Sequence, residues 1–378
     1  MIQKNNVTKV NFSQSIASFT AVKDDSSSFF KVVIITKNKA FNVTLVDFNG
    51  KTYARVNNMC EPFDFTVHIF NLPKSILSKN MILFFSDDKN NCFETVLANE
   101  NLVEVDKQSL IELYDSKIEI VDEQAFELTK GVSYKTLRCT NKNNAPVIAF
   151  AFIAKKGCCR FEAGTAYNGF NAHTQVQTVE EQALENIKAG KKVIGATNAD
   201  FFDMFGDNAP SGLCVKEGIA IANPYSMRSF FGFTLNGDSV IGNFKDNPKL
   251  FGQLYCAVGG REIFLKDGKI NEFSPAEPFS YVCHPRTAVG TTKTGDTIIL
   301  VVDGRIPIYS NGASIVDLAR FMQKLGAESA INLDGGGSST FLVWEKDKFK
   351  IKNRPADLFR PDEKLIRPIY NSLQIVID

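Results

Sequence analysis

One strand–helix–strand segment constrains the fold of this chain more than any other feature of its sequence. The stretch "DTIILVVDGR" is an apolar strand, and "SIVDLARFMQKLGAESAINLDGGGSST" continues with a helix and a second strand. Ser314 caps the helix with Asp317 at its third position, and apolar residues recur at helical spacing until Gly326. A single intervening helix favours parallel strands, so we expect the strands ending at Val302 and Leu333 to run parallel in one sheet.

A second unit of the same kind lies earlier in the chain. In "TVEEQALENIKAGKKVIGATNADFFD", Thr178 and Glu181 form a capping box, and Gly190 ends the helix before a strand from Val193 to Ala196. Residues 131–378 are therefore predicted to form an α/β (mixed α+β) catalytic domain, with mixed sheets flanked by helices.

The first 125 residues have a different texture, with short alternating strands and tight turns. "KAFNVTLVDFNGKTYARV" alternates apolar and polar residues and turns at Asn49-Gly50, the commonest two-residue hairpin signal. Residues 1–125 are predicted to be an all-β, sandwich-like accessory module. We find no group of acid, base or nucleophile in it that suggests chemistry.

Three predicted strands of the second domain are apolar, and each is followed directly by polar residues. Asp303 and Asp334 follow two of them, and Asn198 and Asp200 follow the third. If these strand ends share one edge, the four side chains line a single crevice, where ligands of such sheets bind.

A glycine triplet then follows Asp334 in "INLDGGGSST". Consecutive glycines are kept where the backbone needs positive φ or a ligand must approach it closely. We interpret the loop as a cradle for phosphate or sugar phosphate, formed by Gly335, Gly336, Gly337, Ser338 and Ser339.

Two further motifs supply cationic candidates. "HPRTAVG" holds Arg286, a bidentate anion donor interpreted as a phosphate clamp, beside His284, for which structural and binding roles are equally plausible. "VVDGR" offers Arg305 and Asp303, and for Asp303 a simple turn is an equally good interpretation.

Composition excludes several classes. With 43 basic and 42 acidic residues mixed along 378 positions, the formal charge of +1 gives no field for nucleic acid or anionic membranes. The longest apolar run, Val147 to Ala154, is too short to span a bilayer. Eight cysteines without CxxC spacing favour reduced thiols and a cytoplasmic setting, with an extracellular or virion-associated one as the alternative.

A metal is not required by these motifs. Asp200, Asp203 and Asp207 are clustered hard ligands suited to Ca²⁺ or Mg²⁺, but their spacing is not that of an EF-hand loop. A polar loop is the preferred interpretation of this cluster.

The ordered series "GATNADFFD", "PSGLCVKEG", "HPRTAVG", "VVDGR", "INLDGGGSST" and "RPIYNSLQIV" resembles the phosphodiester glycosidase family over residues 131–378. The resemblance implies hydrolysis of a sugar-1-phosphodiester at the anomeric carbon. By this resemblance Asp334 or Asp200, and then Asp303, would supply the carboxylate, and Asn198 and Arg305 would orient sugar hydroxyls. It does not cover residues 1–125, and Ala199 stands where relatives often have glycine.

Two rival functions remain open at this point. An actin-like phosphotransferase also has glycine-rich phosphate loops, but only about 38 residues follow Thr340, too few for its adenosine-side segment. A non-catalytic glycan-binding protein of a phage or cell surface would also suit the β module. Several carboxylates beside an anionic ligand favour catalysis, because binding alone does not need them.

Overall fold

In the computed structural model, Ser116–Glu272 and Cys283–Asp378 form one compact unit, and Met1–Asp115 with Phe273–Val282 form another. The structure describes the strands of the first unit, and residues 117–377 except 143, 171–174, 223–227, 244, 247, 272–282, 307 and 358–365. No helix in these described parts is both long and apolar enough to cross a membrane.

The described parts of the first unit are strands paired antiparallel in three sheets. Phe48 pairs with Lys51 across the β5–β6 hairpin, the register that the predicted turn at positions 49 and 50 requires. The sheets comprise β10 (Leu102–Val103), β1 (Ile2–Gln3), β7 (Phe65–Phe70), β3 (Lys31–Thr36) and β4 (Ala40–Phe41); β2 (Ser15–Ala21), β6 (Lys51–Met59) and β5 (Val43–Phe48); and β8 (Met81–Ser86) with β9 (Cys92–Leu97).

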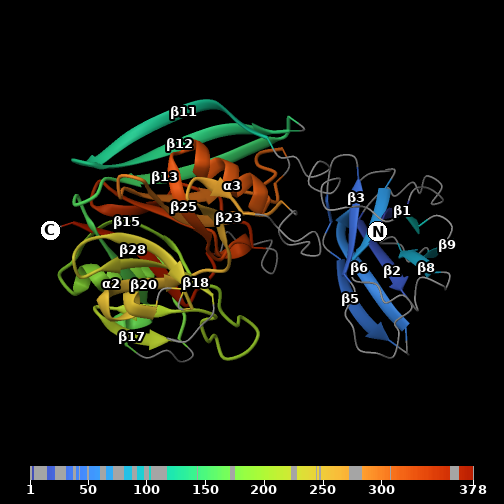
Figure 1. Cartoon of the computed structure of the whole chain (residues 1–378), viewed down its shortest axis with the longest axis horizontal. Coiled ribbons are helices and arrows are strands. Elements are labelled where there is room, and N and C mark those ends of the chain that lie inside the picture. Colours follow the sequence, from blue (N-terminus) through green and yellow to red (C-terminus); the bar gives the residue numbers. More distant parts are fainter. Residues whose placement is uncertain are drawn as a thin grey trace. The chain divides into compact units, whose positions relative to one another are not determined.

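The second unit contains three larger sheets (Figure 1). One has eight strands in the order β11 (Ile118–Thr129), β12 (Val132–Asn141), β13 (Pro146–Ala154), β24 (Thr297–Val302), β23 (Arg286–Thr292), β25 (Ala327–Asn332), β21 (Ile263–Lys266) and β22 (Lys269–Ile270). A five-stranded sheet has the order β14 (Arg160–Thr165), β28 (Asn371–Ile377), β15 (Lys192–Asn198), β26 (Phe341–Glu345) and β27 (Lys348–Ile351). Another has the order β17 (Ile219–Ala222), β16 (Cys214–Lys216), β20 (Leu254–Gly259), β18 (Ser229–Thr234) and β19 (Ser239–Asn243).

The predicted α/β architecture is wrong. Every strand pairing described in the second unit is antiparallel, and its described helices are α2 (Val179–Lys188), α3 (Ile315–Lys324) and the short turns η2 (Ala166–Asn168), η3 (Pro248–Gln253) and η5 (Gly336–Ser338). Both α-helices begin at the predicted capping boxes. The expected parallel neighbours β24 and β25 do run in the same direction, but β23 lies between them and is antiparallel to both. β23, which precedes β24 in the chain and forms a hairpin with it, thus lies where β24 and β25 were expected to pair directly.

One hydrophobic core joins the three sheets. Phe341 of β26 stacks on Phe152 of β13 with 4.0 Å between ring centroids, and Phe161 of β14 meets Phe231 of β18 edge to face at 5.3 Å. Helix α2 covers the other face of the five-stranded sheet through a separate cluster that includes Val179. The strands that end at the candidate site are therefore held on both sides by packed apolar side chains.

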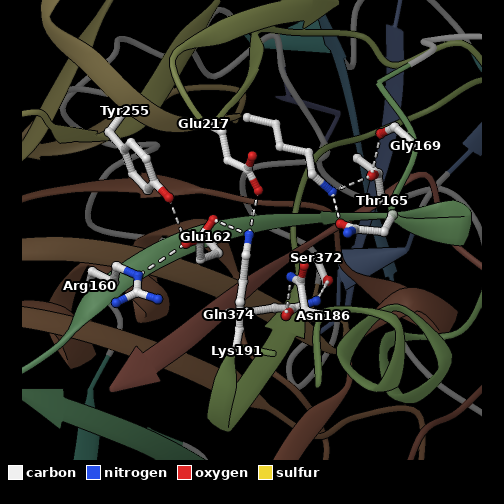
Figure 2. A network of polar contacts seen from close by, with 12 residues as sticks. Arg160, Glu162, Thr165, Gly169, Asn186, Lys191, Glu217, Tyr255, Ser372 and Gln374 are labelled. Atoms are coloured by element: carbon white, nitrogen blue, oxygen red, sulfur yellow. Dashed lines mark hydrogen bonds and ion pairs between the residues drawn. The ribbon is translucent and has the colours of Figure 1, made fainter. Parts of the chain in front are cut away.

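A buried polar network also fixes the five-stranded sheet to the sheet of β20 (Figure 2). The carboxylate of Glu162 in β14 is fully buried and accepts from Arg160 Nε at 3.2 Å, Lys191 Nζ at 3.1 Å and the hydroxyl of Tyr255 at 2.9 Å. Lys191 also reaches Glu217 at 2.6 Å. Because the buried charge is paired on several sides, its desolvation is compensated.

The structure describes six of the eight cysteines. Each of these six has a free thiol, and burial raises the pKa of Cys139, Cys159, Cys214 and Cys283 to about 12. Such thiols are inert rather than reactive. Cys60 and Cys92 lie outside the described side chains.

Candidate functional site

The ends of β15 and β25 meet, although they belong to different sheets. The amide of Asp334 donates to the carbonyl of Ala199 at 2.8 Å, and Asn198 Nδ2 donates to the carbonyl of Asp334 at 2.6 Å. Asn198 Oδ1 in turn accepts from the hydroxyl of Thr287 at 2.8 Å and from the amide of Thr340 at 3.1 Å. Asn198 is fully buried, so its amide acts as a clamp between the strand ends, not as a sugar ligand.

Asp200 lies just beyond that clamp in a closely fitted pocket of backbone. Its Oδ2 accepts from the amide of Gly212 at 2.7 Å, and its own amide donates to Asn371 Oδ1 at 2.8 Å. Its Oδ1 is buried and makes no hydrogen bond of ordinary geometry to the residues that the structure describes. A Cβ at Gly259 would lie 2.5 Å from Oδ2, so only glycine leaves room for the carboxyl group.

Burial dominates the electrostatics of Asp200. It raises the pKa of Asp200 to about 7, and the charge of Asp334 acts in the same direction. Arg228 and the amides of Gly212 and Phe201 oppose that rise. The carboxyl group therefore keeps its proton to a much higher pH than an exposed aspartate, which suits a group that donates or accepts a proton.

Asp334 opens the glycine loop. Its Oδ1 accepts from the amide of Gly335 at 2.8 Å, and the next amide, of Gly336, donates to the carbonyl of Pro285 at 2.8 Å. Burial raises the pKa of Asp334 to about 6, while the Ser338 hydroxyl and the Gly335 amide lower it. Unlike Asp200, Asp334 keeps part of its surface exposed. It is therefore the more accessible carboxylate of this pair.

Two guanidinium groups lie against the glycine loop. A Cβ at Gly336, whose φ is +63°, would lie 2.9 Å from a terminal nitrogen of Arg305, and one at Gly337 would lie 2.4 Å from a terminal nitrogen of Arg367. Arg305 donates to the carbonyl of Ala356 at 3.0 Å, and its buried Nε has no partner among the described residues. The glycines thus allow cationic side chains to pack directly on the backbone.

Arg286 begins β23, and His284 lies two residues before it. Thr287 points towards Asn198, so strand alternation turns Arg286 to the opposite face, where its Nε donates to the carbonyl of Ala313 at 3.0 Å. Arg286 is 1% exposed. Burial also lowers the pKa of His284 to about 3, so the ring stays neutral. The phosphate contact predicted for Arg286 gains no support from this geometry, whereas Arg305 adjoins the loop.

Asp303 is saturated by hydrogen bonds from its own surroundings. Its carboxylate accepts from the Tyr309 hydroxyl at 2.9 Å, from Asn353 Nδ2 at 3.0 Å and from the amide of Arg354 at 2.9 Å. Asn353 also donates to the carbonyl of Ser339 at 3.0 Å. Asp303 is 1% exposed, so it holds the chain behind the glycine loop and does not face a ligand.

Asp203 and Asp207, the acidic residues that follow Asp200, accept hydrogen bonds within a turn. The amide of Phe205 donates to Asp203 Oδ1 at 3.3 Å, and the amide of Ala209 donates to Asp207 Oδ1 at 2.9 Å. Within the described part of the chain, no three His, Cys, Asp or Glu side chains are grouped so as to hold a metal ion. These hydrogen bonds fix the backbone of residues 203–209 in a turn.

Sequence reasoning missed several residues of this site. Arg367 forms an ion pair with Asp357 at 2.7 Å and lies beside Gly337 of the glycine loop. In "RPIYNS", which begins with Arg367, the sequence indicated only a proline followed by a strand. Gly212 and Gly259 face Asp200 from distant segments. The sequence showed these glycines in "PSG" and "AVGG", but it did not indicate that they make room for the side chain of Asp200.

Comparison with known proteins finds several relatives of this chain. A family described as phosphodiester glycosidase matches residues 191–376. The N-acetylglucosamine-1-phosphodiester alpha-N-acetylglucosaminidase of Bos taurus is 42% identical over 128 residues, 30% of this chain and 24% of that protein. Its Mus musculus counterpart is 27% identical over 182 residues, 44% of this chain and 34% of that protein. The chain thus spans about a third or less of the length of these relatives.

One solved structure supports the fold. The zebrafish N-acetylglucosamine-1-phosphodiester alpha-N-acetylglucosaminidase catalytic domain, auto-inhibited by its pro-peptide, aligns with a TM-score of 0.52 and 21% identity. The alignment covers 67% of this chain and 87% of that one. At this identity the likeness concerns the fold alone.

Proposed function

Through residues 191–376 this chain belongs to the phosphodiester glycosidase family, and on that premise we propose that it hydrolyses the glycosidic bond of a sugar-1-phosphodiester. The products are the free sugar and a phosphomonoester. The observation that carries the proposal is a pair of acidic side chains, Asp200 and Asp334, joined by Asn198 beside a glycine loop that is flanked by guanidinium groups.

The proposed reaction breaks the bond between the anomeric carbon and the phosphate oxygen. The phosphate leaves with the bonding electron pair, and water adds to the anomeric carbon and gives up a proton. A phosphate monoester is a better leaving group than an alcohol, so the demand for a strong general acid is small. The larger demand is stabilisation of positive charge on the sugar and of negative charge on the phosphate.

The residues divide these tasks as follows. Asp334, partly exposed and with a pKa of about 6, is ionised at neutral pH and stabilises the cationic sugar. Arg305, which packs against the backbone of the glycine loop, holds the phosphate. Asp200, with a pKa of about 7, accepts the proton of the attacking water in its ionised form, and Asn198 and Asp303 position these groups.

The test is a sugar-release assay on N-acetylglucosamine-1-phosphodiesters with the wild type and three variants. Asp334→Asn and Asp200→Asn should each lose at least about a hundredfold in kcat. Thr292→Ala, at the far end of β23, is the matched control and should keep wild-type kcat. Wild-type turnover in both aspartate variants would refute the assignment. Absence of release by the wild type across a panel of sugars would favour a glycan-binding protein.

A further inference from the structure

Arg228, which directly precedes β18, is a cation to which the proposed reaction assigns no role. Its Nε donates to the carbonyl of Gly260 at 3.1 Å. Its guanidinium group also lies over the ring of Phe201, 5.0 Å from the ring centroid. Phe201 follows Asp200 in the chain, so one of these two contacts is made by the residue next to the candidate base.

The second contact of Arg228 also lies next to Asp200. Gly260 follows Gly259, and a Cβ at Gly259 would lie only 2.5 Å from Oδ2 of Asp200. The carbonyl that accepts from Arg228 therefore belongs to a segment that packs directly on the carboxyl group of Asp200. Two segments that are distant in sequence thus hold Arg228 beside Asp200.

The segment of Gly260 also reaches the strand that leads to Asp334. The amide of Arg261 donates to the carbonyl of Asn332 at 2.8 Å, and a Cβ at Gly260 would lie 2.9 Å from that carbonyl oxygen. Asn332 is the last residue of β25, two residues before Asp334. Arg228 is therefore anchored where the segments that carry the two carboxyl groups come together.

Arg228 and three other titratable groups lie close enough to interact with Asp200. Burial raises the pKa of the Cys214 thiol to about 12 and the pKa of the Tyr370 hydroxyl well above its ordinary value, so both are neutral at physiological pH. Burial is the main cause of the raised pKa of Asp200, and the charge of Asp334 adds to it. The charge of Arg228 lowers the pKa of both carboxyl groups, so it is a counter-charge that the two share.

Two carboxyl groups at one site seldom ionise together, because each negative charge opposes the other. The proposed reaction needs both charges, since Asp334 stabilises the cationic sugar and Asp200 accepts a proton from water. Arginine suits the task of offsetting them, because its guanidinium group is always charged and its planar shape stacks on aromatic rings. The ring of Phe201 and the carbonyl of Gly260 hold that charge in one orientation.

We propose that Arg228 is a positioning residue of the proposed reaction: its fixed positive charge beside Asp200 and Asp334 allows both carboxyl groups to be ionised at once. This inference deepens the proposed function and rests on it. Arg228 acts through Asp200, whose ionised form accepts the proton of the attacking water. Its removal should therefore change the pH dependence of the reaction and leave the products the same.

The experiment follows kcat/KM for an N-acetylglucosamine-1-phosphodiester against pH in three variants of Arg228. Arg228→Gln removes the charge and keeps a donor for the carbonyl of Gly260, Arg228→Met removes both, and Arg228→Lys keeps the charge. In the two neutral variants the rise of kcat/KM should move about one unit towards higher pH. Their kcat/KM should then be about tenfold below that of the wild type at about pH 6 and equal to it at about pH 9. Arg228→Lys should follow the wild-type profile.

Two results of this experiment would overturn the inference. A loss of kcat/KM that is the same at every pH would show a merely structural role, because lost packing does not move the midpoint of a pH profile. A raised KM at every pH, with an unchanged midpoint, would show that Arg228 contacts the substrate instead.

Lys249→Met is the matched control for the loss of one positive charge. Lys249 is exposed in η3, which precedes β20 at the end opposite Gly259. The six residues of β20 separate its two ends by roughly 17 Å. The pH profile of Lys249→Met should equal that of the wild type. A shift as large as that of Arg228→Gln would contradict the inference, because the effect would then come from net charge alone.

A titration without substrate separates this inference from the proposed function. In protein labelled with carbon-13 at the aspartate carboxyl groups, the signal that is absent from Asp200→Asn reports the ionisation of Asp200. Its midpoint should move about one unit towards higher pH in Arg228→Gln and Arg228→Met, and should not move in Lys249→Met. If the wild type releases no sugar but this shift is found, the hydrolase proposal fails and the charge arrangement stands. If sugar is released and the midpoint of Asp200 does not move, the inference on Arg228 fails alone.

Discussion

Replacing Gly259 by alanine should disable the site through a single methyl group. The new Cβ would lie 2.5 Å from Oδ2 of Asp200 and 2.7 Å from its Cγ. Ordinary contact begins near 3.4 Å, so the carboxyl group must move by about 1 Å. It has little room to do so, because the Cα of Gly212 lies 2.8 Å from the same Cβ position.

The expected effect follows from that displacement. A shift of about 1 Å in a catalytic group commonly costs about a hundredfold in rate, so kcat should fall by about that factor. Overpacking at this buried position should lower the free energy of unfolding by about 1–3 kcal/mol. The assays are sugar release under saturating substrate and urea unfolding followed by circular dichroism.

Gly252→Ala is the control for this prediction. A Cβ at Gly252 would meet no atom within 4 Å, and the φ of this residue is not positive, so alanine fits there without strain. It should leave both kcat and the free energy of unfolding unchanged within error. A folded Gly259→Ala protein with wild-type kcat would refute the role given to Asp200, whatever the family likeness.

Three further outcomes follow from the same geometry. The plot of kcat/KM against pH should rise between about pH 6 and about pH 7, as Asp334 and then Asp200 ionise, and should level off just above that range; a flat or falling profile there would contradict these roles. Because burial raises the pKa of Asp200 from 3.8 to about 7, its ionisation penalises the folded state above about pH 7 and not below about pH 4. We therefore expect Asp200→Asn to raise the free energy of unfolding, relative to the wild type, more at about pH 8 than at about pH 4 when both proteins are unfolded in urea. An equal difference at both pH values would contradict the raised pKa of Asp200. Asp303→Ala should lower the free energy of unfolding by about 3 kcal/mol, since it leaves Tyr309 and Asn353 without their acceptor; a thermal melt like that of the wild type would contradict this.

The sequence predicted the local elements better than their arrangement. Both capping boxes begin helices where Thr178 and Ser314 indicated, because capping depends on residues three apart. The sheet order was beyond such local signals. Fully buried strands such as Thr297–Val302 show no alternation, so their neighbours and direction cannot be deduced from their own residues.

The candidate site was predictable where it depends on strand ends. Asn198, Asp200 and Asp334 come together because their strands end at one place, even though the strands belong to two sheets. The direction of individual side chains was not predictable in the same way. Arg286 and Thr287 are adjacent in sequence, yet only Thr287 faces Asn198, and the register that decides this comes from distant partners.

The most direct test of the account is to run the hydrolysis in water enriched in oxygen-18 and to locate the label. Attack at the anomeric carbon, the event for which Asp334 and the glycine loop are assigned, puts the label in the released sugar and leaves the phosphate unlabelled. Label in the phosphate would mean that the phosphorus–oxygen bond breaks, and it would contradict the glycosidase mechanism.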